Sequence, residues 1–294
     1  MAGRFGAVVT AMVTPFKDDT SLDLGRAQEL AAWLLDHGSD GLVVAGTTGE
    51  APTLTDGEKA DLWRAVAEAA SGKGSVIAGT GTYDTAHSIH LTKEAEAAGV
   101  DGILLVAPYY NKPPQSGLLE HFGAIAAETS LPIVLYNIPG RTSVRIANET
   151  LLRLAEVDNI VAVKDATNDF NVTSELIAAA PEGFEVYSGE DVSTFALVCL
   201  GAVGVVSVTS HLAGEQMGEM IRLVEGGDLP AARAIHHRLL PLYSALFHTT
   251  SPIPVKAAMG LVGQPAGPPR LPLVPATEDQ ISVVKKAMED AGAI

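Results

Sequence analysis

The feature of this sequence that most constrains its fold is an eightfold alternation of short apolar runs with longer helix-forming segments. The apolar runs are rich in Val, Ile and Leu. Continuous runs of this kind are typical of strands buried on both faces, and helical connections imply that such strands are parallel. The runs lie at 7–13, 41–45, 75–78, 102–106, 133–136, 160–163, 184–187 and 204–208. Segments with helical apolar spacing lie between them at 24–37, 56–70, 85–98, 117–129 and 173–180.

Eight such units in about 225 residues predict a closed (β/α)8 TIM barrel of the α/β class, rather than an open doubly wound sheet. A dinucleotide-binding sheet would need a glycine-rich turn after the first strand, but here that strand leads into Val13-Thr14-Pro15-Phe16. Only helical patterns follow Ser210, with a Pro- and Gly-rich break at 263–275. We therefore expect a barrel over residues 1–225 and a C-terminal helical extension packed on it over residues 226–294.

The charge balance excludes several classes of partner. Acidic residues outnumber basic ones 35 to 19, which gives a formal net charge of -16. A surface this negative repels phosphate backbones and anionic lipids, so we expect no nucleic acid or membrane partner. The longest apolar stretch, near 195–206, is too short to cross a membrane. The single cysteine, Cys199, favours a reducing, cytoplasmic location, and we expect it to be buried in the core.

Polar residues that are far apart in the sequence lie at the carboxyl ends of the predicted strands. In a barrel these ends form one rim, where the active sites of this architecture are found. The positions therefore predict a single pocket. The residues are Thr14, Thr47, Thr48, Tyr109, Tyr110, Tyr136, Lys164, Ser188 and Ser207.

Lys164 follows the apolar run at 160–163, which places it at the mouth of the barrel. Burial lowers the pKa of a lysine amine, and a neutral amine can form a Schiff base with a carbonyl group. The alternative is a structural lysine paired with the adjacent Asp165. Position alone leaves both interpretations open.

Tyr136 and Arg141 also admit two interpretations each. Tyr136 can transfer a proton if Thr48 and a second tyrosine form a hydrogen-bonded relay, or it can simply be an amphipathic residue at a strand end. Arg141 can hold a carboxylate through two parallel hydrogen bonds, or it can be a solvated surface residue. The loop at 46–50, Gly-Thr-Thr-Gly-Glu, could present N–H groups and hydroxyls to a small carboxylate, but alone it could equally be a tight turn.

The histidines give little support for a metal site. The eight histidines form no spaced cluster with carboxylates. His87 and His90 are three residues apart, and we expect them to lie on a solvated helix face. We therefore predict no bound metal.

These motifs, in this order, resemble those of the pyruvate-dependent class I aldolase superfamily, which includes N-acetylneuraminate lyase and dihydrodipicolinate synthase. Within it the chain is most similar to the dihydrodipicolinate synthase branch, because Arg141 stands where that branch binds the carboxylate of aspartate semialdehyde. The matching segments are GTTGE at 46–50, PYYNKP at 108–113, YNIPGRT at 136–142, VKDAT at 163–167, YSGED at 187–191, GVVSVTS at 204–210, PIPVK at 252–256 and RLPLVP at 270–275.

The resemblance implies a lyase that condenses pyruvate with L-aspartate 4-semialdehyde on the diaminopimelate route to lysine. Lys164 would form the Schiff base, and its iminium nitrogen would act as the electron sink, so no metal or organic cofactor would be needed. Tyr136 would be the general acid/base. Thr47 and Thr48 would bind the pyruvate carboxylate and link Tyr136 to Tyr110 of a neighbouring subunit.

The resemblance further implies substrate-binding roles for Arg141, Gly189 and the backbone of Val206. The implied assembly is a homotetramer made of two tight dimers, with Tyr110 crossing the tight-dimer interface.

Lysine-inhibited members of the family hold lysine at the dimer interface among His, Glu, Asn and Tyr side chains. The matching residues here are Asp56, Lys59, Tyr83 and His87, with Tyr109 retained. His87 replaces the acidic residue that would attract the inhibitor's amino group, and Lys59 replaces a histidine. Both changes remove attraction for that amino group. The sequence therefore predicts weak or absent lysine inhibition.

Two alternative functions remain at this point. A 2-keto-3-deoxy sugar acid aldolase or an N-acetylneuraminate lyase would share the scaffold, but Arg141 argues against their polyhydroxylated substrates. A barrel that only senses pyruvate, without catalysis, would not need Lys164, Tyr136 and Thr48 together.

Overall fold

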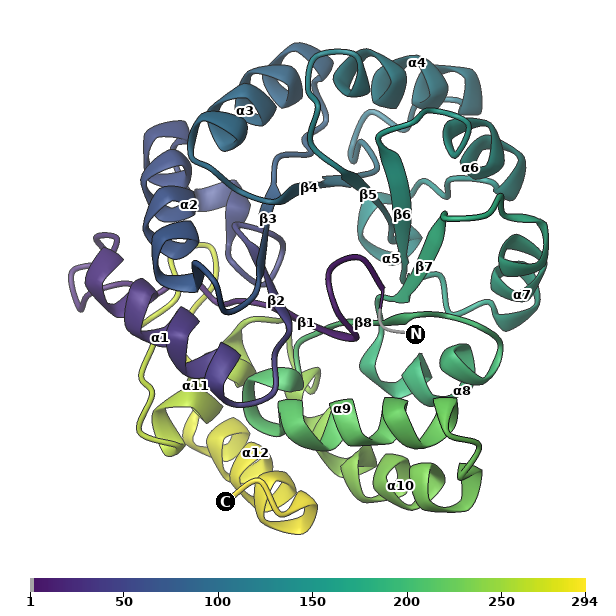
Figure 1. Cartoon of the computed structure of the whole chain (residues 1–294). Helices are drawn as coiled ribbons and strands as arrows, with labels where there is room; N and C mark the ends of the chain where they lie inside the picture. The colour runs from purple at the N-terminus through teal and green to yellow at the C-terminus, as the bar shows by residue number, and fades with distance from the viewer. Residues whose placement is uncertain (1–2) are drawn as a thin grey trace.

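The structure, a computed structural model that describes residues 3–294, is a closed barrel of eight parallel strands surrounded by helices (Figure 1). Each strand pairs with the next, and β1 pairs with β8 to close the barrel. The predicted fold is confirmed. The strands are β1 Val8–Ala11, β2 Gly41–Val44, β3 Ser75–Gly79, β4 Gly102–Val106, β5 Ile133–Asn137, β6 Ile160–Asp165, β7 Glu185–Ser188 and β8 Gly204–Ser207.

Helices on the outside of the barrel connect the strands. Thr55 and Glu58 form a capping box at the start of α2. The connecting elements are α1 Leu24–Asp36, η1 Ala51–Thr53, α2 Asp56–Ala70, α3 Thr85–Ala97, α4 Gln115–Ala126, α5 Pro139–Thr142, α6 Asn148–Leu154, α7 Phe170–Ala179, η2 Asp191–Ser193 and α8 Thr194–Cys199, and α9 Ser210–Glu225 follows β8.

Element boundaries differ from the predicted ones where a local cap decides them. Helix α7 begins at Phe170, three residues before the predicted start, because the Asp169 carboxylate accepts a hydrogen bond from the Val172 N–H at 3.3 Å. Strand β6 continues past the predicted end at 163 through Lys164 to Asp165. Lys164, the candidate catalytic residue, therefore lies on β6 itself, where hydrogen bonding to β5 and β7 fixes its backbone.

The expected burial of Cys199 is wrong, because this cysteine is exposed. It is the last residue of the short helix α8, whose buried side chains are Thr194, Leu197 and Val198. At about 100° per residue, position 199 lies on the opposite side of the helix from these three. The apolar run around Cys199 therefore reflects one buried helix face.

The interior of the barrel is closed at the end where the strands begin and is more open at the other end. Phe5 lies across the closed end, where its ring would meet a Cβ on Gly102 at 2.8 Å. Above it, buried apolar side chains fill the centre. At the rim, His211 joins β1 to β8: its Nδ1–H donates to the Val208 carbonyl (2.8 Å), and its Nε2 accepts from the Val13 N–H (3.2 Å). Burial lowers the pKa of His211 to about 4, so it stays neutral.

Three further helices follow the barrel, α10 Leu229–Leu246, α11 Ile253–Leu261 and α12 Glu278–Ala291. Helix α10 lies beside α9, and α11 and α12, toward the yellow end of the colour scale, lie between α10 and α1 (Figure 1). The expected division at residue 226 stays a prediction. Across residues 3–294, no helix combines the length and the apolar character needed to span a membrane.

Candidate active site

Lys164 and Tyr136 are direct neighbours across the β5–β6 pair, at the rim of the barrel. The Lys164 Nζ lies 4.1 Å from the centroid of the Tyr136 ring, and both side chains are almost fully buried. Asp165 points to the opposite face of β6, where it accepts hydrogen bonds from Thr173 Oγ1 and from the Thr167 N–H. The alternative in which Lys164 is paired with Asp165 is therefore wrong.

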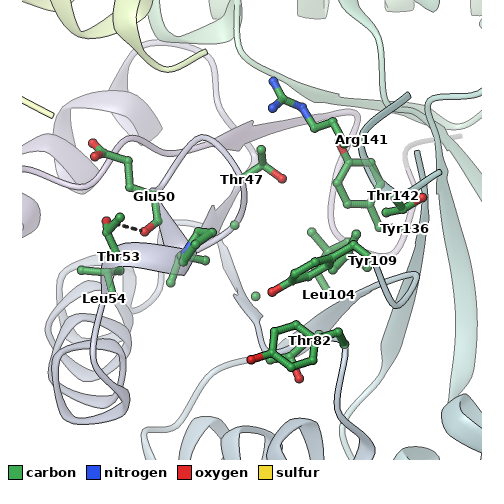
Figure 2. Close-up of a pocket in the computed structure, with 18 of the residues that line it drawn as sticks. Thr47, Glu50, Thr53, Leu54, Thr82, Leu104, Tyr109, Tyr136, Arg141 and Thr142 are labelled. Carbon is green, nitrogen blue, oxygen red and sulfur yellow. Dashed lines mark hydrogen bonds between the residues drawn. The ribbon is translucent and has the colours of Figure 1, made fainter. Parts of the chain in front are cut away.

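Two adjoining cavities open at this rim and share Thr47, Tyr136, Ile138, Arg141 and Ser251. The smaller one has a volume of about 250 Å³ and is lined by Lys164. A cavity of this size suits a small acid, not a polymer. The larger one, of about 560 Å³, extends over η1 and the start of α2. Figure 2 shows the larger cavity, with Arg141, Tyr136 and Thr47 on one side.

Burial shifts the pKa values of both central groups in useful directions. Desolvation lowers the pKa of Lys164 to about 8, against the opposing effects of Glu190 and Asp191. Desolvation, with a smaller contribution from Glu190, raises the pKa of Tyr136, while a hydrogen bond from Thr47 and the charge of Arg141 act against it. At neutral pH the site therefore holds an accessible free amine beside a protonated phenol.

The loop at 46–50 follows β2 and brings Thr47 and Thr48 to the rim. The Glu50 N–H donates to the Thr47 carbonyl at 3.1 Å, which closes the turn. Thr14 Oγ1 donates to the Gly49 carbonyl at 2.6 Å and ties the loop to the end of β1. Thr48 is buried and lines the smaller cavity, whereas Thr47 lines both cavities.

The remaining predicted substrate-binding residues also line the smaller cavity. Val206 lies on β8 and is buried. Gly189 follows β7, and its N–H donates to the Asp165 carbonyl at 2.7 Å. A Cβ at position 189 would lie 2.9 Å from the Ala166 Cβ, so only glycine allows this close approach. Arg141, on α5, is exposed and borders both cavities.

Of the residues predicted at the rim, Thr14, Ser188, Ser207 and Tyr110 line neither cavity, and among those given a catalytic or substrate-binding role this holds for Tyr110 alone. Its side chain is 92% exposed, and its backbone has a φ of 71°. Tyr109, its neighbour, lines the larger cavity and meets Tyr83 edge to face, with ring centroids 5.3 Å apart. The phenol of Tyr110 therefore lies outside both cavities of its own chain.

The sequence analysis missed several lining residues. Glu190 and Asp191 lie in the quoted segment at 187–191 but were given no role, although both line the cavity of Lys164. Phe247 and Ser251 come from the connection between α10 and α11. No pattern at a strand end could have identified these two, since their segment has no strand. The buried hydroxyl of Ser251 has no hydrogen-bond partner among the described residues.

The histidines at 87 and 90 lie on an open face of α3, with side chains 40% and 54% exposed, and both rings approach Asp56. His87 Nε2 lies 3.0 Å from Asp56 Oδ1, and His90 Nε2 lies 3.7 Å from Asp56 Oδ2. Within residues 3–294, no three His, Cys, Asp or Glu side chains gather closely enough to hold a metal ion.

Comparison with known proteins agrees with this geometry. The Dihydrodipicolinate synthetase family matches residues 4–291. A 4-hydroxy-tetrahydrodipicolinate synthase of Moorella thermoacetica is 53% identical over 291 residues, covering 99% of this chain and all of the relative. The crystal structure of dihydrodipicolinate synthase from Cyanidioschyzon merolae with lysine bound superposes with a TM-score of 0.97 at 46% identity, over 99% of this chain and 100% of that one. The Bacillus anthracis dihydrodipicolinate synthase gives 0.96 at 45% identity, over 98% of both chains.

Proposed function

The chain belongs to the Dihydrodipicolinate synthetase family, and from this premise we propose how its rim residues carry out the reaction. The enzyme is an aldolase-type lyase. It condenses pyruvate with L-aspartate 4-semialdehyde to give 4-hydroxy-tetrahydrodipicolinate on the diaminopimelate route to lysine. The observation that carries the proposal is the buried amine of Lys164, placed 4.1 Å from the ring of Tyr136 at the barrel mouth.

The first stage is formation of a Schiff base. The neutral amine of Lys164 attacks the keto carbon of pyruvate, and loss of water leaves an iminium. The phenol of Tyr136 gives a proton to the departing hydroxyl. Thr47 is the first member of the relay that then returns a proton to Tyr136. Because burial keeps the phenol protonated, Tyr136 is in the acid form when pyruvate arrives.

The second stage forms the carbon–carbon bond. Loss of a methyl proton converts the iminium into an enamine, with the electron pair of the C–H bond moving toward nitrogen. The enamine carbon attacks the aldehyde, whose oxygen takes up a proton. The amino group of the semialdehyde then displaces Lys164 as the ring closes, which frees the enzyme.

The two substrates bind different residues of the site. The pyruvate carboxylate binds the hydroxyls and N–H groups of Thr47 and Thr48, near Val206. The carboxylate of the semialdehyde binds the guanidinium of Arg141, which can hold it through two hydrogen bonds. Gly189, which lines the same cavity as Lys164, also contacts the substrate in this proposal.

Mass spectrometry after borohydride reduction tests this function. Incubation with pyruvate should attach one pyruvate-derived group to Lys164, and Lys164→Ala should abolish both the label and turnover. A label on another lysine, or normal turnover by Lys164→Ala, would overturn the proposal. Assaying turnover with the semialdehyde separates a catalyst from a protein that only binds pyruvate.

We also propose that Tyr110 completes the relay of a neighbouring subunit within a homotetramer of tight dimers. Its 92% exposure leaves the phenol free to enter another chain's site. The proposed location is the cytoplasm, in keeping with a single cysteine that has no partner for an internal disulfide.

We further propose weak or absent inhibition by lysine. The candidate residues Asp56, Lys59, Tyr83, His87 and Tyr109 do line one cavity. However, the carboxylate of Asp56 already faces the His87 imidazole at 3.0 Å, and the cationic Lys59 is buried beside it. An inhibitor's amino group therefore meets a cation and an occupied carboxylate.

An inhibition curve tests this proposal. Half-inhibition should require more than about 1 mM lysine, which corresponds to less than roughly 4 kcal/mol of binding. Since lysine is bound in the similar Cyanidioschyzon merolae enzyme, that enzyme is a suitable positive control. Half-inhibition well below this concentration would contradict the proposal.

A further inference from the structure

A buried ion pair joins the C-terminal helices to the Thr47–Thr48 loop. Lys256 lies on α11, and its Nζ lies 2.6 Å from Glu50 Oε1. The side chains are only 3% and 1% exposed. The ammonium also donates to the Pro268 carbonyl at 3.2 Å and lies 4.4 Å from the centroid of the Phe16 ring. The reaction described above uses neither charge.

Glu50 is part of the turn that carries Thr47 and Thr48. Its backbone has a φ of 56°, a left-handed conformation that is uncommon for residues other than glycine and persists only where surrounding contacts hold it. The N–H of Glu50 closes the turn onto the Thr47 carbonyl, and its own carbonyl accepts from Thr53 Oγ1 at 3.0 Å. Its Oε2 accepts from the Arg270 N–H at 2.8 Å.

Glu50 borders the larger cavity, but it does not line the smaller cavity that contains Lys164. Figure 2 shows Glu50 and Thr47 on opposite sides of the loop, with the Glu50 side chain directed away from Tyr136 and Arg141. Glu50 is therefore fixed from the C-terminal side, while Thr47 faces the site. A shift of Glu50 would move the turn and, with it, the hydroxyl of Thr47.

The charge of Glu50 matters as much as its position. A carboxylate in a buried site creates a field that water hardly screens, and it repels any anion bound on the same loop. The ammonium of Lys256 cancels that field. Removal of one partner from a buried pair leaves an uncompensated charge, which is far more harmful than loss of both.

We propose that the Glu50–Lys256 ion pair positions the pyruvate-binding loop: it fixes the turn that carries Thr47 and Thr48, and it neutralises Glu50 so that a keto acid carboxylate can bind beside it. This proposal rests on the proposed function, which places the pyruvate carboxylate on Thr47 and Thr48. Lys256 and Glu50 are positioning residues in this account, since neither touches the reacting atoms.

The chain offers a matched control in a second ion pair of the same region. Arg270 Nη2 lies 2.6 Å from Glu58 Oε1, and its guanidinium also lies over the Phe16 ring, with Cζ 4.3 Å from the centroid. This pair joins the C-terminal segment to α2, and a change at Glu58 leaves in place the backbone N–H of Arg270 that donates to Glu50. A glutamine at position 58 can still accept the Thr55 N–H of the capping box. Glu58→Gln therefore weakens the same region without leaving a charge on the loop.

Steady-state kinetics of Lys256→Met, Glu50→Gln, the double variant and Glu58→Gln test the proposal. In Lys256→Met the KM for pyruvate should rise at least about tenfold, and the KM for the aldehyde should change less than about twofold. The double variant should recover most of this loss, because it contains no unpaired charge. Glu58→Gln should lower Tm and leave the KM for pyruvate within about twofold of wild type.

The outcomes separate the proposal from a general effect on folding. An unchanged KM for pyruvate in folded Lys256→Met, an equal rise for both substrates, or a double variant no better than Lys256→Met would overturn it. If Lys256→Met does not fold, Glu50→Gln decides: its KM for pyruvate must rise by at least about threefold, and a wild-type value would contradict the ion pair's role.

Wild-type enzyme trapped with pyruvate and borohydride is the reference for these measurements. If the wild type does not label at Lys164, the proposed function fails. If it labels normally and only the kinetic pattern is missing, the ion-pair proposal fails alone.

Discussion

At the scale of single residues, reactivity at Lys164 depends on the difference between desolvation and nearby charge. Burial disfavours the ammonium, whereas Glu190 and Asp191 favour it, and the balance leaves the pKa at about 8. Roughly a tenth of the amine is then neutral at pH 7, against well under a thousandth for an exposed lysine. Burial in the barrel thus provides the nucleophile.

The pH dependence of Schiff-base formation follows from this pKa. The rate should rise with pH through the range below about 8 and level off above it, since the neutral amine is the reactive form. Tyr136 should add no fall over the same range, because burial raises its pKa. The measurement is incubation with pyruvate at each pH, followed by a borohydride quench at one fixed pH. A flat profile between pH 6 and pH 8, a range of about two units, would contradict the depressed pKa.

Two substitutions should move the midpoint of that profile in opposite directions. Glu190→Gln removes a negative charge that favours the ammonium, so the pKa of Lys164 should fall. Arg141→Ala removes a positive charge, so the pKa should rise. The same labelling assay measures both midpoints. Shifts in the same direction would show that altered packing, rather than charge, is responsible.

Arg141 should also determine recognition of the aldehyde. Arg141→Ala should reduce kcat/KM for the semialdehyde by a factor that corresponds to about 2 kcal/mol or more, because the substrate carboxylate loses a bidentate partner. Labelling by pyruvate should continue. Arg145→Ala is the matched control, since Arg145 pairs with Asp169 at 3.1 Å and lines neither cavity. Equal losses in the two variants would exclude a specific role for Arg141.

At the scale of elements, the conformation of the loop after β2 depends on how closely its backbone at Gly49 can approach the ends of β1 and β2. A Cβ on Gly49 would lie 3.1 Å from Ala45 Cα, Ala45 N and Met12 O, and these backbone atoms cannot move aside easily. Ala45, which links β2 to the loop, has a φ of 54°. Its backbone is therefore already in an uncommon conformation.

Gly49→Ala should therefore displace Thr47 and Thr48. We expect a rise in the KM for pyruvate of about threefold or more and a loss of roughly 1–3 kcal/mol in the free energy of unfolding. Gly57→Ala is the control: no atom lies within 4 Å of its Cβ position on α2, and an alanine there should stabilise the helix by about 0.4–1 kcal/mol. Kinetics and thermal unfolding distinguish the two variants. A wild-type KM for pyruvate in Gly49→Ala would mean that the loop is not tightly held.

The element scale also explains how much the sequence could predict. Strands buried on both faces leave continuous apolar runs, so all eight strands were identified, and Lys164, Tyr136 and Thr47 were placed at the rim from their position after such runs. The sequence did not predict the cap at Asp169, which depends on a single hydrogen bond. It also did not predict the orientation of Cys199, which depends on one turn of helix.

Other parts of the site depend on contacts between segments that are distant in the sequence. Ser251 and Lys256 reach the rim only because α11 packs there, and the partner of Lys256 lies about two hundred residues earlier at Glu50. No local pattern contains that information. Position and periodicity alone left the roles of Lys164 and Arg141 open. Those roles were predicted from the resemblance of whole motifs to a known family.

At the scale of the whole molecule, the role proposed for Tyr110 requires a second chain to complete the site. A two-fold symmetric interface would carry the tyrosine of each subunit into the site of the other. The phenol would then extend the relay from Tyr136 and Thr47 toward solvent, which one chain alone does not provide. Among residues 3–294, Tyr136 is the only tyrosine that lines the cavity of Lys164.

Complementation between two defective chains tests this arrangement. Lys164→Ala lacks the nucleophile but retains Tyr110, whereas Tyr110→Phe retains the nucleophile but offers its partner no phenol. A mixed dimer contains one site with both groups. Random reassembly of equal amounts should therefore restore about a quarter of wild-type activity, since half of the dimers are mixed and each has one complete site. If Tyr110 instead served its own chain, mixing would give no more than the average of the two parents, and the crossed arrangement would be wrong.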